Sequence, residues 1–188
     1  MLIQCYQQPL PQLRVNEDYI LREQSLNDTD AFFRYYADPN VSKHILATIP
    51  TNIAQAQEEI QYCRHLFYLK RGMYWTIADA KTNEMIGAIG LYINNQHHRA
   101  EICYDLAMSH WRKGIMSAAM CTVINHCFQK MEIVRLEAVT IKANIPSIAI
   151  LEKLGFKHEA TLKNYRYFKD RPHTVELFGL TPDDCQTS

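Results

Sequence analysis

The sequence lacks a net charge, and this absence bears on its partners. Its 188 residues hold 20 lysines and arginines against 20 aspartates and glutamates, so the formal charge at pH 7 is zero. A strongly basic surface, the electrostatic signature of nucleic-acid binding, is therefore missing. Because net charge says nothing about distribution, a local basic patch stays compatible with this sum. We expect no nucleic-acid partner.

Long apolar runs are missing as well. No stretch approaches the roughly 18 apolar residues of a membrane-spanning helix, so no membrane partner is expected. The first segment, MLIQCYQQPLPQL, has no basic leader and is interrupted by Pro9 and Pro11. These features argue against a signal peptide. The sequence thus predicts a soluble, cytoplasmic protein.

Metal-ligand spacings are a third absence. The six cysteines show no Cys-x-x-Cys pair and no His/Cys metal pattern; they occupy positions 5, 63, 103, 121, 127 and 185. Several lie in apolar runs, where a free thiol behaves as a small hydrophobic side chain. We therefore expect a reducing compartment and no metal site.

What the sequence does contain is a large apolar fraction, 47%, which is enough to bury a sizeable core. The length indicates one domain over residues 1–188, with a core of about 15–180, a loose arm of about a dozen residues before it and a polar tail after it. Strands are expected at 19–23, 73–80, 85–93, 99–108, 134–141, 157–168 and 173–180. Helices are expected at about 27–38, 52–70, 113–130 and 146–154.

These elements sum to a mixed α/β domain. Pro39 is expected to end the first helix, because a proline disfavours helical geometry in the residue before it. Residues 99–156 form a strand–helix–strand–helix unit at the centre. Its first crossover makes the two strands parallel neighbours.

The segment SHWRKGIMSAAM, residues 109–120, joins a strand to a helix. A helix start offers free N–H groups and the positive end of the helix dipole to an anion. Gly114 lets the backbone approach a phosphate, and Arg112 and Lys113 add charge. The motifs GxxxxGK[ST] and GxGxxG are absent. The segment alone therefore leaves two interpretations open, a solvated turn and a phosphate-binding turn.

A second segment, NIPSIAILEKLGF at 144–156, decides between them. Together the two segments resemble the GNAT superfamily of acyl-CoA-dependent N-acyltransferases, and within it the RimJ/RimL branch of ribosomal-protein N-terminal acetyltransferases. Residues 111–116 match the pyrophosphate motif Q/R-x-x-G-x-G/A, and the second segment matches the N-x-x-S…E-K-L-G-F signature. Trp111 replaces the usual Gln or Arg, Arg112 a frequent Gly, and Met116 a small residue. Leu151 stands where many members carry a proton-donating tyrosine.

The resemblance implies a central, mostly antiparallel sheet with a splayed parallel strand pair, flanked by about four helices. It implies acetyl-CoA as cosubstrate. The pantetheine arm would enter the splay and pair with backbone near Leu106 and Met108. The pyrophosphate would lie on the amides of Arg112, Lys113, Gly114, Ile115, Met116 and Ser117. The side chain of Asn144 would hold the arm or the thioester.

The reaction implied is direct attack of an amine on the thioester. Glu101 matches the strand glutamate that serves as general base in some members, and Asp105 on the same strand face is the second candidate. Ser147 would protonate the departing sulfur, as proposed for a serine in this branch. Each residue also has a structural interpretation: Glu101 as a solvated carboxylate, Ser147 as a helix cap and Asn144 as a turn residue.

The acceptor is not fixed by the sequence. By the resemblance, residues 38–55 and 160–175 would shape its pocket. The amine acceptor is then a protein N-terminus or a small molecule. A non-catalytic CoA-binding module and a protein-interaction module on the same fold stay open alternatives. Monomer and homodimer are both compatible with the sequence.

Overall fold

The computed structural model describes residues 9–187 of the chain. Its centre is an eight-stranded sheet in the order β1-β2-β3-β4-β5-β6-β8-β7. The strands are β1 Leu13–Arg14, β2 Tyr19–Glu23, β3 Gly72–Asp79, β4 Met85–Asn94, β5 Arg99–Leu106, β6 Arg135–Thr140, β7 Lys157–Phe168 and β8 Arg171–Leu180. All neighbours pair antiparallel except β5 and β6, which are parallel. The predicted mixed α/β fold with one parallel pair is confirmed.

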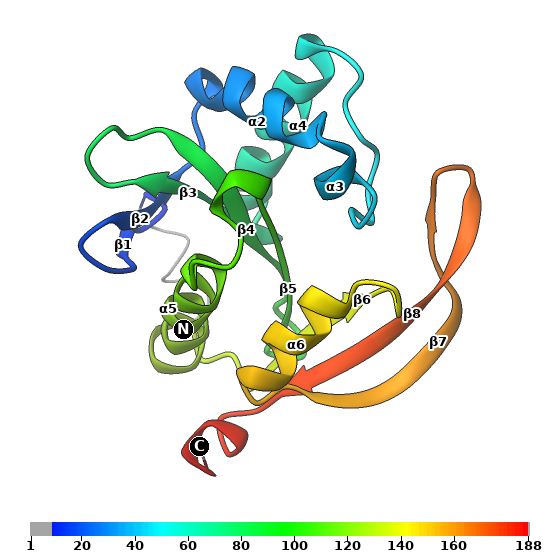
Figure 1. The fold of residues 1–188 in the computed structure, drawn as a ribbon. Helices are drawn as coiled ribbons and strands as arrows, with labels where there is room; N and C mark the ends of the chain where they lie inside the picture. Colours follow the sequence, from blue (N-terminus) through cyan, green and yellow to red (C-terminus); the bar gives the residue numbers. More distant parts are fainter. Residues whose placement is uncertain (1–8, 188) are drawn as a thin grey trace.

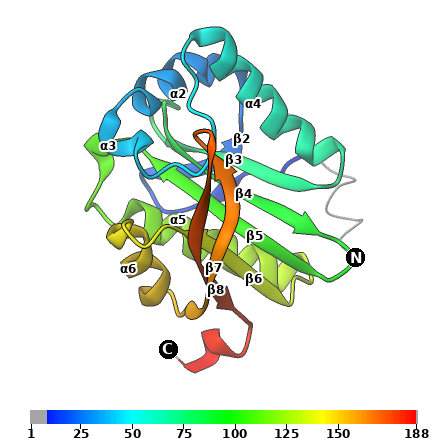
Figure 2. The same cartoon turned by 90° about the vertical axis from the view of Figure 1, so that its right-hand side faces the viewer.

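Helices cover both faces of the sheet (Figures 1 and 2). They are α2 Thr29–Tyr36, α3 Pro39–Ser42, α4 Ile53–Tyr68, α5 Ile115–Lys130 and α6 Ile145–Lys153. Buried side chains of α2 and α4 form one core with β4, and those of α5 and α6 join the larger core on the opposite side. Along α5, Met116, Met120, Val123 and Cys127 are all buried, as expected for an apolar stripe with a period of three to four residues.

One local expectation, the end of the first helix, differs from the structure. Pro39 does not end the first helix: α2 stops at Tyr36, and Pro39 opens α3, which Asp38 caps by accepting from the Asn40 amide. Proline suits the first turn of a helix, where its missing N–H has no partner to lose. The described residues therefore hold five α-helices, in agreement with the expectation of about four.

Three described residues near the two ends of the domain make defined contacts. Residues 1–8 of the predicted arm lie outside the described residues. Of the rest, Leu10 is buried in the larger core, and the Pro11 carbonyl accepts a hydrogen bond of 2.8 Å from the indole of Trp75. In the tail, Asp184 accepts from Lys157 Nζ at 2.6 Å. The loose arm and polar tail stay a prediction, and the contacts of Leu10, Pro11 and Asp184 mark where packing against the domain begins and ends among the described residues.

The feature that positions the site is the separation of β5 from β6. Their pairing runs only from Arg99 and Arg135 to Glu101 and Glu137. Beyond it, β5 continues to Leu106 and β6 to Thr140 without pairing to each other. The two strands thus diverge toward their C-terminal ends. The splayed pair expected at 99–107 and 134–141 is therefore present.

The β7–β8 hairpin extends beyond the rest of the sheet (Figure 1). Near its tip, Lys169 Nζ donates to the Ser42 carbonyl at 3.2 Å, and on β7 Arg166 pairs with Glu101 of β5. The hairpin thus contacts the end of α3 and borders the open end of the splay.

Candidate active site

The turn before α5 is built on two left-handed residues. Gly114 is the N-cap of α5 with φ of 74°, and Arg112 has φ of 60°. A Cβ on Gly114 would meet nothing within 4 Å, so backbone conformation rather than space makes glycine suitable there. The same conformation explains why glycine would suit position 112. Among the described residues no side chain caps this helix end, so its first amides stay available to an anion.

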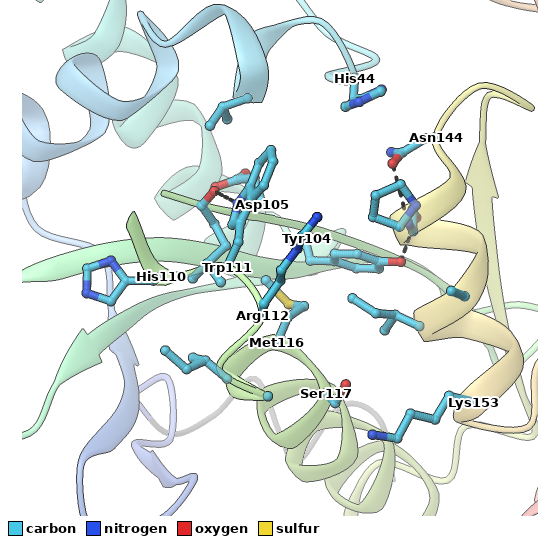
Figure 3. Close-up of a pocket in the computed structure, with 18 of the residues that line it drawn as sticks. His44, Tyr104, Asp105, His110, Trp111, Arg112, Met116, Ser117, Asn144 and Lys153 are labelled. Carbon is cyan, nitrogen blue, oxygen red and sulfur yellow. Dashed lines mark hydrogen bonds between the residues drawn. The ribbon is translucent and has the colours of Figure 1, made fainter. Parts of the chain in front are cut away.

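A cavity of about 530 Å³ opens at this turn (Figure 3). Its walls come from the end of β5, the start of α5 and one side of α6. It brings together eight of the predicted site residues: Leu106, Arg112, Gly114, Ile115, Met116, Ser117, Asn144 and Ser147. Met108, Lys113 and Glu101 are not among its lining residues. The predicted coenzyme-binding turn thus faces a cavity of suitable size for a ligand.

A basic residue at this cavity was not predicted. Lys153 on α6 lines the cavity, and Figure 3 shows it directed toward Ser117 on α5. An exposed ammonium beside a helix start adds charge for an anion. Its place at the end of α6, three residues before Phe156, gave no signal of this role.

Trp111 occupies backbone acceptors that were expected to serve the pantetheine arm. Its indole Nε1 donates to the Leu106 carbonyl at 2.8 Å, and its amide donates to the Met108 carbonyl at 3.1 Å. Each carbonyl retains a second lone pair. The residue that departs from the family motif therefore has a structural task, fixing the end of β5 to the turn.

Ser147 and Asn144 separate into different tasks. Asn144 is the N-cap of α6, and its Oδ1 accepts from the Ser147 amide at 3.3 Å. The Ser147 hydroxyl is not a cap; it lies 2.8 Å from the hydroxyl of Tyr104 on β5. Burial raises the pKa of Tyr104 to about 12, so this phenol stays protonated at neutral pH. Tyr104 can therefore donate to Ser147, a contact between distant segments that sequence reasoning missed.

A second cavity, of about 240 Å³, adjoins the first. His44, Ile45, Tyr104, Asp105, Asn144 and Ser147 line both cavities. Glu101 lines only this second cavity, where its carboxylate pairs with Arg166. Burial raises the pKa of Glu101, and the charge of Arg166 opposes that rise. The first candidate base thus lies beside the shared wall, held by an arginine.

Asp105 lies on the shared wall itself. Its two oxygens accept hydrogen bonds from the hydroxyls of Tyr35 at 2.6 Å and Tyr36 at 2.9 Å. Burial raises its pKa to about 6, and the two hydrogen bonds oppose that rise. A carboxylate with a pKa close to neutrality is suited to accept a proton from an amine. Alternation along β5 placed Asp105 on the face of Glu101, but nothing in the sequence indicated the two tyrosines.

No metal site or membrane span is found in the described part of the chain. Across residues 9–187, His, Cys, Asp and Glu side chains do not gather in threes as a metal ion would require. None of the helices there has the length and apolarity needed to cross a membrane.

Comparison with known proteins identifies a matching family and a similar sequence. The sequence pattern of the family described as an acetyltransferase (GNAT) domain matches residues 18–157. An uncharacterized N-acetyltransferase, p20 of Bacillus licheniformis, is 35% identical over 165 residues, covering 87% of this chain and 93% of that protein.

Solved structures share the fold at low identity. One is an acetyltransferase from Salmonella typhimurium, described as modifying the N-terminal serine of ribosomal protein L7/L12; it has a TM-score of 0.81 at 20% identity, covering 91% of this chain and 99% of that chain. RimL in complex with coenzyme A has a TM-score of 0.80 at 19% identity, covering 93% and 99%. The motifs, the splayed strands and these matches agree, and the chain therefore belongs to the GNAT family of acetyltransferases.

Proposed function

We propose that the protein transfers an acetyl group from acetyl-CoA to a primary amine by direct attack. The observation that carries the proposal is the meeting of two cavities at Tyr104, Asp105, Asn144 and Ser147. One cavity has a helix start with free amides, and the other is lined by carboxylates. A thioester and an amine would approach each other from opposite sides of this wall.

The first cavity is the proposed coenzyme site. The amides of residues 112–117 would bind the pyrophosphate, with added charge from Arg112, Lys113 and Lys153. Backbone near Leu106 and Met108 would bind the pantetheine arm. The Asn144 amide nitrogen would be free to donate, because its oxygen is the group that caps α6.

The chemistry needs one base and one acid. The acceptor ammonium gives a proton to Asp105, and the neutral amine then attacks the thioester carbonyl. The C–N bond forms, the C–S bond breaks and the thiolate takes a proton from Ser147. The proton that the nitrogen loses on becoming an amide restores the Ser147 hydroxyl, directly or through its hydrogen-bond partner Tyr104. Asp105 is favoured over Glu101 because it lines both cavities and has no arginine partner among the described residues. The role of Glu101 as general base stays a prediction, tested below.

The acceptor is a small amine or a protein N-terminus. The Salmonella protein of the same fold acts, by its description, on the N-terminal serine of a ribosomal protein. An α-amine is easier to deprotonate than a lysine, with a pKa of about 7.7–8.0 against about 10.4. A cytoplasmic location would suit either acceptor.

The test combines binding and turnover. Acetyl-CoA should raise the melting temperature, since a ligand that binds only the native state stabilises it. Mass spectrometry of peptides and small amines incubated with acetyl-CoA should show the gain of one acetyl group, with matching release of free thiol. Binding without transfer to any acceptor would instead support a non-catalytic CoA-binding module, and an unchanged melting temperature would support an interaction module.

A further inference from the structure

The second cavity contains a buried acceptor without a partner. Gln24, which directly follows β2, lines this cavity and is only 4% exposed. Its Oε1 atom is buried and has no hydrogen-bond partner among the described residues. A buried polar atom left unpaired costs about 1–3 kcal/mol. Because Gln24 lines the cavity, its unpaired oxygen favours a ligand that brings a donor.

Glu59 adds a carboxylate to the same cavity. It projects from α4, is partly buried, and its partner is the weakly donating Sγ of Cys63 at 3.8 Å. Burial raises the pKa of Glu59, and the charge of Glu59 contributes to the raised pKa of Asp105. The charge of Glu59 thus acts on a second carboxylate that lines the same cavity, and neither carboxylate forms an ion pair among the described residues.

The cations of the cavity do not offset these charges. Arg166 is engaged by Glu101. His44 also lines the cavity, but burial and nearby lysines lower its pKa, which favours the neutral ring at pH 7. The remaining surplus consists of the Glu59 and Asp105 carboxylates and the Gln24 carbonyl, which are all acceptors. A complementary ligand is therefore cationic and rich in N–H donors.

The size of the cavity limits the ligand. About 240 Å³ is below the roughly 300–1,000 Å³ typical of drug-sized ligand pockets. A short aliphatic amine fits this volume better than several residues of a bound peptide. Between the polar groups the walls are apolar or aromatic, with Phe32, Ile60 and Ala88, which suits a methylene chain.

We propose that the second cavity selects a short aliphatic diamine, with one amine at Asp105 and Ser147 for acetylation and the other held by Gln24 and Glu59. This inference rests on the proposed acetyl transfer and names the acceptor class of that same site. Gln24 and Glu59 would act on specificity alone, since they touch the end of the acceptor that does not react.

The test compares putrescine with n-butylamine, which has the same carbon chain and one amine fewer. With saturating acetyl-CoA, kcat/KM for putrescine should exceed that for n-butylamine by about 10- to 100-fold, as expected for a hydrogen bond to a charged group. Glu59→Gln should remove most of this preference while the KM for acetyl-CoA stays unchanged. Glu58→Gln, at an exposed neighbouring position on α4, is the matched control and should change nothing.

Gln24→Met provides a second, independent variant. It is similar in shape and removes the unpaired oxygen, so the melting temperature should hold or rise while putrescine turnover falls. A merely structural role of Gln24 would lower both together.

The outcomes separate the two proposals. Equal turnover of both amines by the wild type, or an undiminished preference in Glu59→Gln, overturns the diamine site while acetyl transfer stands. Preferred acetylation of a serine-initiated peptide over putrescine overturns it in favour of a protein N-terminus. Putrescine binding that calorimetry detects and Glu59→Gln abolishes, without transfer to any amine, supports the site and overturns the proposed reaction.

Discussion

The two cavities that meet at Ser147 present different chemical groups to a ligand. The larger one presents main-chain amides of a helix start, backed by exposed basic side chains. The smaller one presents side chains, namely carboxylates, tyrosines and an unpaired glutamine oxygen. Backbone amides keep their chemistry when the residue changes, whereas a carboxylate is lost with one substitution. This difference explains why motif departures such as Trp111 and Met116 leave the first cavity intact.

The largest effect is expected from the two carboxylates of β5, Asp105 and Glu101. Asp105→Asn should lower kcat at pH 7.5 by about 100-fold or more, the range for loss of a general base. In the wild type, kcat/KM should fall as the pH drops below about 6, where Asp105 becomes protonated, and this limb should vanish in the variant. Glu101→Gln is the matched variant on the same strand face. Loss of the limb in Glu101→Gln, and not in Asp105→Asn, would return the role of base to Glu101.

The same carboxylate gives a stability signature. Because the folded-state pKa of Asp105 is raised from 3.8 to about 6, the folded protein binds more protons than the unfolded chain between these values. The contribution of Asp105 to the free energy of unfolding should therefore decrease as the pH rises through this window. Denaturant unfolding should therefore show that the free energy of unfolding of Asp105→Asn, relative to that of the wild type, increases from pH 4 to pH 7.

The next largest effect on kcat is expected at Ser147 and Tyr104, which line both cavities. Ser147→Ala should lower kcat by about 100-fold if the hydroxyl protonates the thiolate, with little change in acetyl-CoA affinity. Tyr104→Phe removes only the donor to Ser147 and should cost less, about 10-fold. Thiol release and calorimetry measure the two quantities. A larger loss in Tyr104→Phe than in Ser147→Ala would make the tyrosine the proton donor.

On the coenzyme side the effect is smaller and concerns binding. Gly114→Ala should destabilise the left-handed turn by about 1–2 kcal/mol and weaken acetyl-CoA binding by about 5- to 30-fold. Gly155→Ala is the matched control: Gly155 has φ of 87°, and its added Cβ would meet only ordinary contacts. Both variants should melt earlier, and only Gly114→Ala should bind the coenzyme less well by calorimetry. Equal affinity of Gly114→Ala and Gly155→Ala for acetyl-CoA would show that the turn at Gly114 does not contribute to coenzyme binding.

The smallest effect is expected at Arg112. Arg112→Gly relieves a non-glycine residue at φ of 60°, so the free energy of unfolding should rise by about 1 kcal/mol. Loss of an exposed cation should weaken acetyl-CoA binding only about 2- to 5-fold, and less at high salt. Urea titration and calorimetry at two salt concentrations measure these changes. A destabilised variant would show that the Arg112 side chain contributes packing that outweighs the backbone strain.

The sequence predicted the first cavity better than the second, and chain topology explains this. Arg112, Gly114 and Ser117 lie in one continuous turn, so local patterning and a motif were sufficient to locate them. Periodicity likewise located β5, α5 and β6, because each buries one face. The second cavity joins Gln24, Glu59 and Arg166, which are far apart in the chain. No local signal marks such residues, since their proximity exists only after the sheet has formed.

Short-range chemistry accounts for the remaining misses. A proline was expected to stop a helix at residue 39, but Asp38 and Asn40 supply a cap that starts one instead. The position of Ser147 near a helix start is compatible with a helix cap. In the structure Asn144 is the N-cap of α6, which leaves the Ser147 hydroxyl for Tyr104. Both depend on which of several polar neighbours bonds the backbone, a choice that composition alone does not determine.

The chain order of the two cavities has a consequence for engineering. Most residues that line the larger cavity lie within residues 104–153, whereas the smaller cavity also draws on residues 24–63 and on Arg166 of the β7–β8 hairpin. Segments on either side of this central block could be exchanged with those of a relative while the block proposed to bind the thioester is kept. The choice of acceptor would then be changed by replacing only the segments before and after residues 104–153.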